Sequence, residues 1–430
     1  MLKGRYGRLP NTIALPCIPS CSHYLKPRWQ NWVTRLYKRF MSLNAAVIEP
    51  VGGHSGMDYY DYGLCNGLQQ AHVDVTLYTC DEPGILATTP FKVKPYYVRI
   101  YGSDPAWRRA LRYLKGSWQS LHHARQQKAH ISHLHFFHIG PLELINVLLS
   151  KAMGLRVIVT AHDVKSFADG LSVTLFEHWS YQLADRIIVH NQVSQHELLA
   201  SLPVKPEKLA VIPHGNYLST INAKPMPNST AARDKFGIPI DAKVLLFFGQ
   251  IKDVKGLDLL LQAMPAIVAS YPKTRLIVAG RAWKADFQKY QHIIDQHQLA
   301  DYCHLFIEHV PHDMVSTYFA AADLVVLPYK RIYQSGVLLM SMSFGKPVLT
   351  SDLPGMVEII NDGNTGYLFG TENAAALTKK VLHVFNNASE AQQVAANGLA
   401  LVTEVYGWSR IGQQTAQLYA TTLEVKNPGS

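Results

Sequence analysis

The sequence lacks the cysteine patterns of a disulfide framework or of a structural zinc site. Its cysteines are few, odd in number and without a C-x-x-C pair; they are Cys17, Cys21, Cys65, Cys80 and Cys303. Charged residues make up only 17% of the 430 residues, and the glycines and prolines are scattered along the chain, which argues against long disordered or low-complexity tracts. These shortages predict a globular protein of a reducing compartment.

Long apolar runs are also missing. No stretch of about 18 apolar residues occurs, so the sequence predicts no membrane-spanning helix. Residues 1–40 contain four prolines and no strongly apolar core, which argues against a cleaved secretory peptide. We interpret residues 1–40 as a flexible basic extension, or as sequence upstream of a start at Met41.

Positive charge is concentrated in two blocks, although the whole chain carries a net charge of +10. Residues 1–40 hold eight Lys/Arg and no acid, and residues 92–128 hold nine Lys/Arg and one Asp. The rest of the chain is therefore acidic. No motif that reads bases with aromatic and basic residues accompanies either block, so we expect no nucleic-acid partner.

The second block contains a basic amphipathic helix. Trp107, Leu111, Leu114 and Trp118 recur at helical spacing beside four basic residues between Arg108 and Lys115. Such a helix suits the anionic surface of a membrane, where each basic residue contributes about 1 kcal/mol. The alternative is a charged helix that is simply solvated.

From Leu43 onward, short apolar strands alternate with helices, and the alternation restarts at Lys243. This pattern predicts an α/β protein with two Rossmann-like, doubly wound parallel-sheet domains. Ligands bind at the carboxyl ends of parallel strands, so we expect the site in an interdomain cleft. The expected divisions are the basic extension 1–40, a first domain 41–215, a connector 216–240, a second domain 241–400, and a C-terminal helix and tail 401–430.

Three loops that follow strands and open helices carry residues suited to a diphosphate. Glycines let the backbone approach the phosphates, and a lysine or the N–H groups at a helix start can meet their charge. The residues concerned are Gly52, Gly53, Lys252, Lys255, Ser335 and Gly336. Taken singly, each has a plainer explanation, either a tight strand-to-helix turn or a solvated lysine.

Several segments together resemble glycosyltransferase family 4, whose members are retaining enzymes of the GT-B fold. In the second half these are G-Q-I-K-D-V-K-G-L-D, Y-F-A-A-A-D-L-V-V-L-P-Y, F-G-K-P-V-L-T-S-D and E-I-I-N-D-G-N-T-G-Y-L-F. In the first half, I-E-P-V-G-G-H-S-G-M-D and V-T-A-H-D look like the first loop and the histidine loop of that family. The resemblance covers roughly residues 44–420.

The resemblance implies a role for each matching position. It implies that the donor diphosphate is held by Gly53, Lys255, Ser335 and Gly336. Glu308 and Gly280 would lie near the nucleotide base, and His162 would face the transferred sugar. Read from the residues alone, Glu308 could instead be an exposed loop carboxylate, and His162 a hydrogen-bonded histidine at a strand end.

The sequence departs from the family pattern where a Glu-x7-Glu pair is common. The aligned positions are Ile332 and Met340, which cannot hydrogen-bond to hydroxyl groups. Within the Q-S-G-V-L variant, Gln334 is a candidate substitute for sugar recognition. The arginine that usually follows the strand glycine is Gln250, which leaves Lys252 as the replacement cation.

We therefore expect a retaining hexosyltransferase that uses a UDP- or GDP-sugar, without a cofactor or a metal. His162 and Lys255 are its candidate catalytic residues. The expected acceptor is a lipid-linked oligosaccharide in exopolysaccharide or surface-glycan assembly, with the protein cytoplasmic and peripheral on the inner membrane face. The alternatives are a nucleotide-sugar epimerase on the same fold and a catalytically impaired scaffold that binds nucleotide sugars.

Overall fold

The structure is a computed structural model that describes residues 43–54, 56–81, 89–163, 174–221 and 226–424. These residues all belong to one compact unit, Phe40–Ser430. The expected basic extension, residues 1–40, lies outside the described part. Within that part, every helix is too short or too polar to traverse a bilayer.

The first sheet is fully parallel and has the strand order β3-β2-β1-β4-β5-β6-β7. Its strands are β1 (Asn44–Ile48), β2 (Asp74–Cys80), β3 (Lys92–Tyr97), β4 (Ile131–Phe136), β5 (Arg156–Ala161), β6 (Arg186–Val189) and β7 (Leu209–Val211). The order reverses between β1 and β4. In open α/β sheets such a switch point opens a crevice at the carboxyl ends of the strands.

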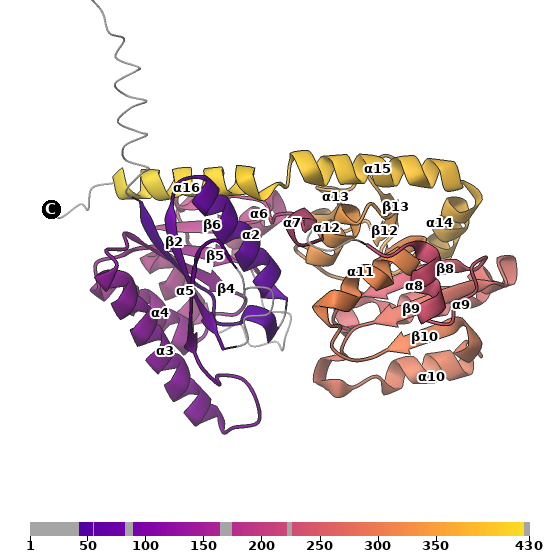
Figure 1. Ribbon diagram of the computed structural model, residues 1–430, viewed down its shortest axis with the longest axis horizontal. Coiled ribbons are helices and arrows are strands. Elements are labelled where there is room, and N and C mark those ends of the chain that lie inside the picture. The colour runs from indigo at the N-terminus through magenta and orange to yellow at the C-terminus, as the bar shows by residue number, and fades with distance from the viewer. Residues whose placement is uncertain (1–42, 55, 82–88, 164–173, 222–225, 425–430) are drawn as a thin grey trace, which may run out of the picture. The chain divides into compact units, whose positions relative to one another are not determined.

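Helices cover both faces of the first sheet (Figure 1). On one face lie α3 (Ala106–Gln126), α4 (Pro141–Ala152), α5 (Thr174–Leu183) and α6 (Gln192–Ser201). On the other face lie α2 (Met57–Gln70) and the last helix, α16 (Trp408–Glu424), which packs along α2. The sequence had left open which domain the last helix covers.

The second sheet is also fully parallel, with the order β10-β9-β8-β11-β12-β13. Its strands are β8 (Lys243–Phe248), β9 (Thr274–Ala279), β10 (Cys303–Phe306), β11 (Leu324–Leu327), β12 (Val348–Ser351) and β13 (Tyr367–Phe369). Its switch point lies between β8 and β11. The expectation of two parallel α/β domains is therefore confirmed.

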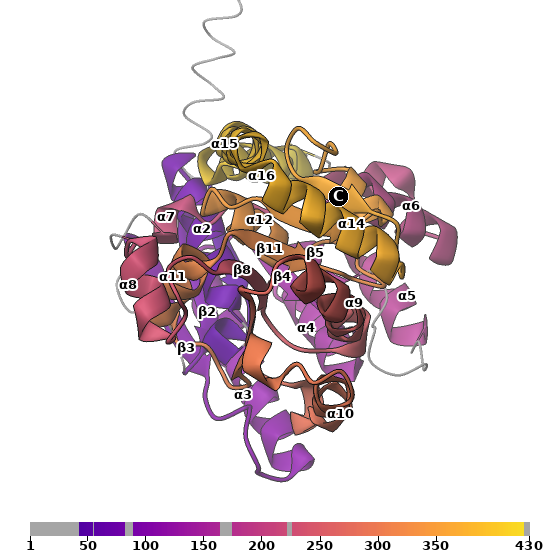
Figure 2. The same cartoon turned by 90° about the vertical axis from the view of Figure 1, so that its right-hand side faces the viewer.

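The second sheet is likewise covered on both faces (Figure 2). On one side are α8 (Ser229–Lys235), α11 (His312–Ala321) and α12 (Gly336–Ser343). On the other are α9 (Leu257–Ser270), α10 (Gln288–Gln296) and α14 (Ala374–Asn386). Three further helices are α7 (Leu218–Ile221), α13 (Pro354–Val357) and α15 (Ala388–Glu404), the last of which packs on α12. In the expected connector, residues 216–240, α8 packs on α11.

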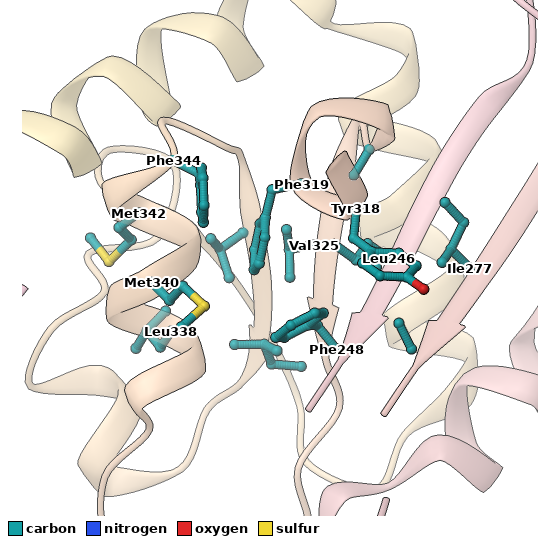
Figure 3. Close-up of a cluster of buried hydrophobic side chains, with 14 of the residues drawn as sticks. Leu246, Phe248, Ile277, Tyr318, Phe319, Val325, Leu338, Met340, Met342 and Phe344 are labelled. Carbon is teal, nitrogen blue, oxygen red and sulfur yellow. The ribbon is translucent and has the colours of Figure 1, made fainter. Parts of the chain in front are cut away.

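Helix α12 is mostly apolar, and it is buried against the second sheet. Leu338 and Met340 from this helix lie in one cluster with Phe319 of α11 and with Leu246 and Val325 of the strands (Figure 3). Burying one such side chain contributes roughly 1.5–3 kcal/mol. This packing fixes the N-terminal end of α12 at the carboxyl edge of the sheet.

Candidate functional site

The loop after β1 is held in place by the carboxyl group of Glu49. This group accepts hydrogen bonds from the N–H groups of Val51 at 2.9 Å and Gly52 at 2.7 Å. Gly52 and Gly56 have φ angles of 54° and 74°, in the left-handed region that favours glycine. Gly53 lies between them, so positions 52, 53 and 56 present only backbone.

A second buried carboxyl group, Asp61, lies next to Glu49. Burial raises the pKa of Asp61 well above its usual range, and the neighbouring Glu49 raises it further. Burial also raises the pKa of Glu49, although the N–H groups of Gly52 and Val51 oppose this. Two carboxyl groups buried close together are not readily ionised at the same time, because their like charges repel in a poorly solvated site. We infer that Asp61 is the protonated one, since the Glu49 carboxylate accepts the loop N–H groups of Val51 and Gly52.

The raised pKa of Asp61 predicts a pH-dependent effect of the Asp61→Asn substitution. A carboxyl whose pKa is raised in the folded state contributes stability at low pH, and this contribution is lost as the pH rises. The neutral amide does not titrate, so the Tm of Asp61→Asn relative to the native protein should increase between pH 5 and pH 8. Thermal unfolding across this range, with the exposed Asp234→Asn as control, measures it. A parallel pH profile for the two proteins would contradict the raised pKa of Asp61.

His162 follows β5 and is buried in the first domain. Its backbone N–H donates to the carbonyl of Phe136 at 2.8 Å, and its ring stacks on Phe137 at a centroid distance of 4.4 Å. Burial lowers the pKa of His162 well below its usual range, so the ring is neutral. Among the described residues, its Nε2 has no hydrogen-bond partner.

Two lysines of the second domain face a carboxyl group of the first. Lys252 and Lys255 belong to the loop after β8, and both lower the pKa of Asp163, which burial nevertheless raises to about 6. Burial lowers the pKa of Lys255 to about 8, while Asp163 opposes the shift. The Nζ of Lys255 lies 3.8 Å from the ring centroid of Tyr329. This group of two cations and one anion carries a net positive charge, so it would attract a further anion.

The N-terminal end of α12 lies beside the histidine loop. The Ser335 Oγ caps the helix by accepting from the N–H of Leu338 at 3.2 Å. A Cβ on Gly336 would lie only 2.6 Å from the hydroxyl of Tyr217, so a side chain here would force Tyr217 to shift. The side-chain amide of Gln334 donates to the carbonyl of His162 at 3.4 Å. The backbone N–H groups at this helix start suit an anionic ligand.

The aromatic residues of α2 connect the glycine loop to the start of α12. Tyr60, in the first turn of α2, packs edge-on against His162 at 4.8 Å and against His214 at 5.0 Å. The Nε2 of His214 lies 3.8 Å from the position that a Cβ on Gly336 would take. The structure thus brings the loops around Gly52 and Ser335 to the same region of the molecule.

Gly280 and Glu308 follow the neighbouring strands β9 and β10. Gly280 has a φ of 146°, and a Cβ there would lie 2.0 Å from the carbonyl oxygen of Gly249, which follows β8. The ends of β8 and β9 can therefore approach this closely only because residue 280 is glycine. A hollow of about 670 Å³, measured to its open mouth, adjoins them; it is lined by Gln250, Arg281, Ala282, Trp283 and Lys284. Glu308 is exposed. The Nζ of Lys252 lies 4.4 Å from the ring of Trp283.

Ile332 and Met340, the two residues that depart from the family pattern, also lie in apolar surroundings. Met340 is buried in the core of the second domain, and Ile332 packs against the same cluster. In the described part of the chain, no group of three or more His, Cys, Asp and Glu residues is arranged to hold a metal ion. Sugar contacts in this region must therefore come from other residues.

The sequence analysis missed four residues of this region: Glu49, Asp163, His190 and His214. Asp163 directly follows His162 in V-T-A-H-D, and Glu49 directly follows β1, so both had a local signal at a strand end. His190 and His214 also follow strands. Their relation to Ser335 depends on contacts between distant parts of the chain, which no local pattern reveals.

Two family models match separate halves of the chain. Residues 54–217 match the model described as Glycosyltransferase Family 4, and residues 228–400 match the model described as Glycosyl transferases group 1. The chain is 24% identical over 412 residues to a D-inositol 3-phosphate glycosyltransferase of Streptomyces scabiei, which covers 86% of this chain and 87% of the relative. A second such enzyme, from Streptomyces avermitilis, is 27% identical over 56% of this chain and 53% of its own length.

The fold also resembles solved structures. Sucrose-phosphate synthase of Thermosynechococcus elongatus superimposes with a TM-score of 0.72 at 18% identity, over 89% of this chain and 100% of that one. HepE of Anabaena, solved in complex with UDP and glucose, gives a TM-score of 0.72 at 16% identity over 88% and 100%. At these identities the likeness concerns the fold, with its two parallel-sheet domains.

Proposed function

We propose that this chain is a glycosyltransferase of the GT-B type that transfers a hexose from a nucleoside-diphosphate sugar to a lipid-linked glycan with retention of anomeric configuration. The observation that carries the proposal is the arrangement of Lys252 and Lys255 around Asp163. Two partly desolvated ammonium groups share a single carboxyl. A diphosphate would neutralise the excess positive charge.

The donor diphosphate is assigned to the space between these lysines and the start of α12. The glycine loop at Gly52 and Gly53 would approach it from the first domain, and Ser335 and Gly336 would present helix N–H groups from the second. The base would then extend toward Gly280 and Glu308, beside the hollow lined by Trp283. UDP and GDP both fit this scheme, and the UDP complex of HepE favours UDP.

The chemical step requires stabilising the charge that develops on the departing diphosphate. Fixed N–H groups together with Lys255 can do this in a poorly hydrated site. We propose that the acceptor hydroxyl attacks from the same face as the leaving group, without a covalent enzyme intermediate. The nearby Glu358 carboxylate accepts from the backbone N–H groups of Gln192 and Val193 at 3.1 and 2.8 Å. His162 and Gln334 would contact the sugar.

A panel of nucleotides tests the donor assignment. UDP, GDP and ADP, each with and without a sugar, are added to the full chain in a thermal-shift assay. A ligand at about 100 times its dissociation constant stabilises by about 2.7 kcal/mol. We expect one nucleoside diphosphate and its sugar to raise the Tm. If none of them does, the proposed function is wrong. Incubation of the binding sugar nucleotide without acceptor tests for epimerase activity, and NMR of the transferred product tests retention.

Helix α3 supports a peripheral position on an anionic membrane. Its Trp107, Leu111 and Trp118 side chains are 61%, 57% and 54% exposed, although all three are large and apolar. They lie on one side of the helix, because positions 107, 111 and 118 fall within about 40° of one another at 3.6 residues per turn. The exposed Arg108 and Lys115 lie along one edge of this stripe. An apolar stripe bordered by basic residues is typical of helices that lie in the membrane interface.

Charge reversal on α3 tests the membrane assignment. Removing two basic residues near an anionic surface costs about 2 kcal/mol, so Arg108→Glu with Lys115→Glu should weaken binding roughly 30-fold. Co-sedimentation with vesicles of phosphatidylglycerol and phosphatidylcholine at low salt measures it. Lys379→Glu with Arg410→Glu changes the net charge equally on exposed positions elsewhere and serves as the control. Equal loss in both variants, or no binding by the native protein, would contradict a role of α3.

A further inference from the structure

His190 directly follows β6, and its ring has a defined tautomer. The Nδ1 lies 2.9 Å from the carbonyl oxygen of Ile212. A carbonyl only accepts, so Nδ1 carries the hydrogen and Nε2 keeps its lone pair. The side chain is only 6% exposed, and its Nε2 has no hydrogen-bond partner among the described residues. A buried acceptor of this kind requires a donor beyond the described residues, and water or a ligand can supply it.

His214 repeats this arrangement from the next strand end. Its Nδ1 lies 2.7 Å from the carbonyl oxygen of Gly215, so its Nε2 also keeps the lone pair. Burial lowers the pKa of His190 to about 3 and that of His214 to about 4. Both rings are therefore neutral at physiological pH. Their centroids are 5.7 Å apart.

Both imidazoles line one hollow at the start of α12. It measures about 350 Å³ when the open space at its mouth is included, and its lining includes His190, His214, Gln334 and Ser335. The Gln334 amide donates to the carbonyl of His162, and its buried Oε1 has no partner among the described residues. Three hydrogen-bond acceptors from both domains thus meet in this space.

A set of acceptors selects a ligand by its donors. Phosphate oxygens only accept, so a phosphate would not satisfy these atoms. A hydroxyl group donates, and a sugar ring carries several of them. One N–H of the Asn191 side-chain amide donates to the carbonyl of Tyr333 at 2.6 Å. Ile332 and Met340 offer no polar side-chain atom to these hydroxyls.

We propose that His190 and His214 are specificity-determining residues that bind hydroxyl groups of the transferred sugar through their Nε2 atoms. This inference rests on the proposed function, because it assigns the sugar subsite of the same nucleotide-sugar site. Gln334 Oε1 completes the set. A hexose whose hydroxyls reach these nitrogens is favoured over a deoxy sugar, because a buried acceptor left without its donor is unfavourable.

His190→Phe separates recognition of the sugar from recognition of the nucleotide. Phenylalanine keeps an aromatic ring beside Tyr60 and His214 and removes the Nε2 acceptor. Titration calorimetry gives the Kd of each nucleoside diphosphate and of its sugar, using UDP-glucose, UDP-N-acetylglucosamine, GDP-mannose and ADP-glucose. For the donor that binds the native protein, the Kd of the sugar nucleotide should rise roughly tenfold. The Kd of the free nucleotide should stay within about twofold.

Two further variants keep the test decisive. His214→Phe should give the same selective loss, and it serves alone if His190→Phe does not fold. His123→Phe is the control. This histidine belongs to α3, its Nδ1 lies 2.8 Å from the hydroxyl oxygen of Tyr78, and it does not line the hollow. If both imidazole variants keep the native ratio of the two Kd values, water fills the hollow and the inference is overturned. If the native protein binds no sugar nucleotide, the proposed function itself fails.

Discussion

Replacing Lys255 by Met is expected to lower kcat for sugar transfer by about 10²- to 10³-fold. The reason is that a fixed charged donor next to a departing oxyanion contributes about 3–4 kcal/mol to the transition state, and methionine has no charge. The Tm should be unchanged or slightly higher, because burial already disfavours the ammonium form and lowers the pKa of Lys255 to about 8. Steady-state kinetics and thermal unfolding of the same preparation measure both effects.

A second buried lysine provides the matched control. Lys346 also has its pKa lowered by burial, but its ammonium donates to the carbonyl of Ala322 at 3.0 Å, within the second domain. Lys346→Met should therefore lower stability and leave kcat almost unchanged. Equal kcat in Lys255→Met and the native protein would remove Lys255 from the diphosphate site.

The pKa of Lys255 also predicts how the native enzyme depends on pH. The profile of kcat/KM reports the groups of the free enzyme. An ammonium group with a pKa of about 8 loses its charge as the pH rises through this value, so kcat/KM should decline above about pH 8. The residual activity of Lys255→Met should lack this decline. A native profile that stays flat to pH 9.5 would contradict the assignment.

The strands of both sheets could largely be predicted because buried parallel strands are continuous apolar runs. V-L-L-F-F of β8 and R-I-I-V of β6 are examples. The exception is β3, K-V-K-P-Y-Y, which pairs only with β2 at the sheet edge. Its two lysines and Pro95 are tolerated there because one side of an edge strand needs no partner. The same composition hides such a strand from a search for apolar runs.

The candidate site could be predicted only where its chemistry is local in the chain. Gly52, Lys255 and Ser335 stand at strand-to-helix junctions, and each junction has its own sequence signal. The proposed role of His190 depends on its contact with Ile212 and on its position beside Gln334. These residues are 22 and 144 positions away in the sequence. The tautomer of its ring and the converging acceptors follow from tertiary packing alone.

Trp408→Ala is expected to cause the largest loss of stability among the substitutions considered. The indole begins α16 and is only 7% exposed. A Cβ on Gly63 or Gly215 would lie 2.0 or 2.2 Å from its ring atoms, so both glycines exist to admit it. Its Nε1 donates to the carbonyl of Asn216 at 2.6 Å. Truncating a buried tryptophan costs about 3–5 kcal/mol, and the Asn216 carbonyl also loses its donor.

The position of Trp408 makes this loss affect the whole fold. The N–H of Asn216 donates to the carbonyl of Tyr406 at 2.8 Å, and its side-chain amide donates to that of Val402 at 2.8 Å. The chain segments leaving and re-entering the first domain are therefore tied together under the indole. Urea unfolding should give a clearly lower midpoint for Trp408→Ala, whereas Trp179→Ala, whose indole is 49% exposed, should stay within about 0.5 kcal/mol of the native protein. Similar midpoints for the two variants would mean that α16 is held by its other contacts with α2.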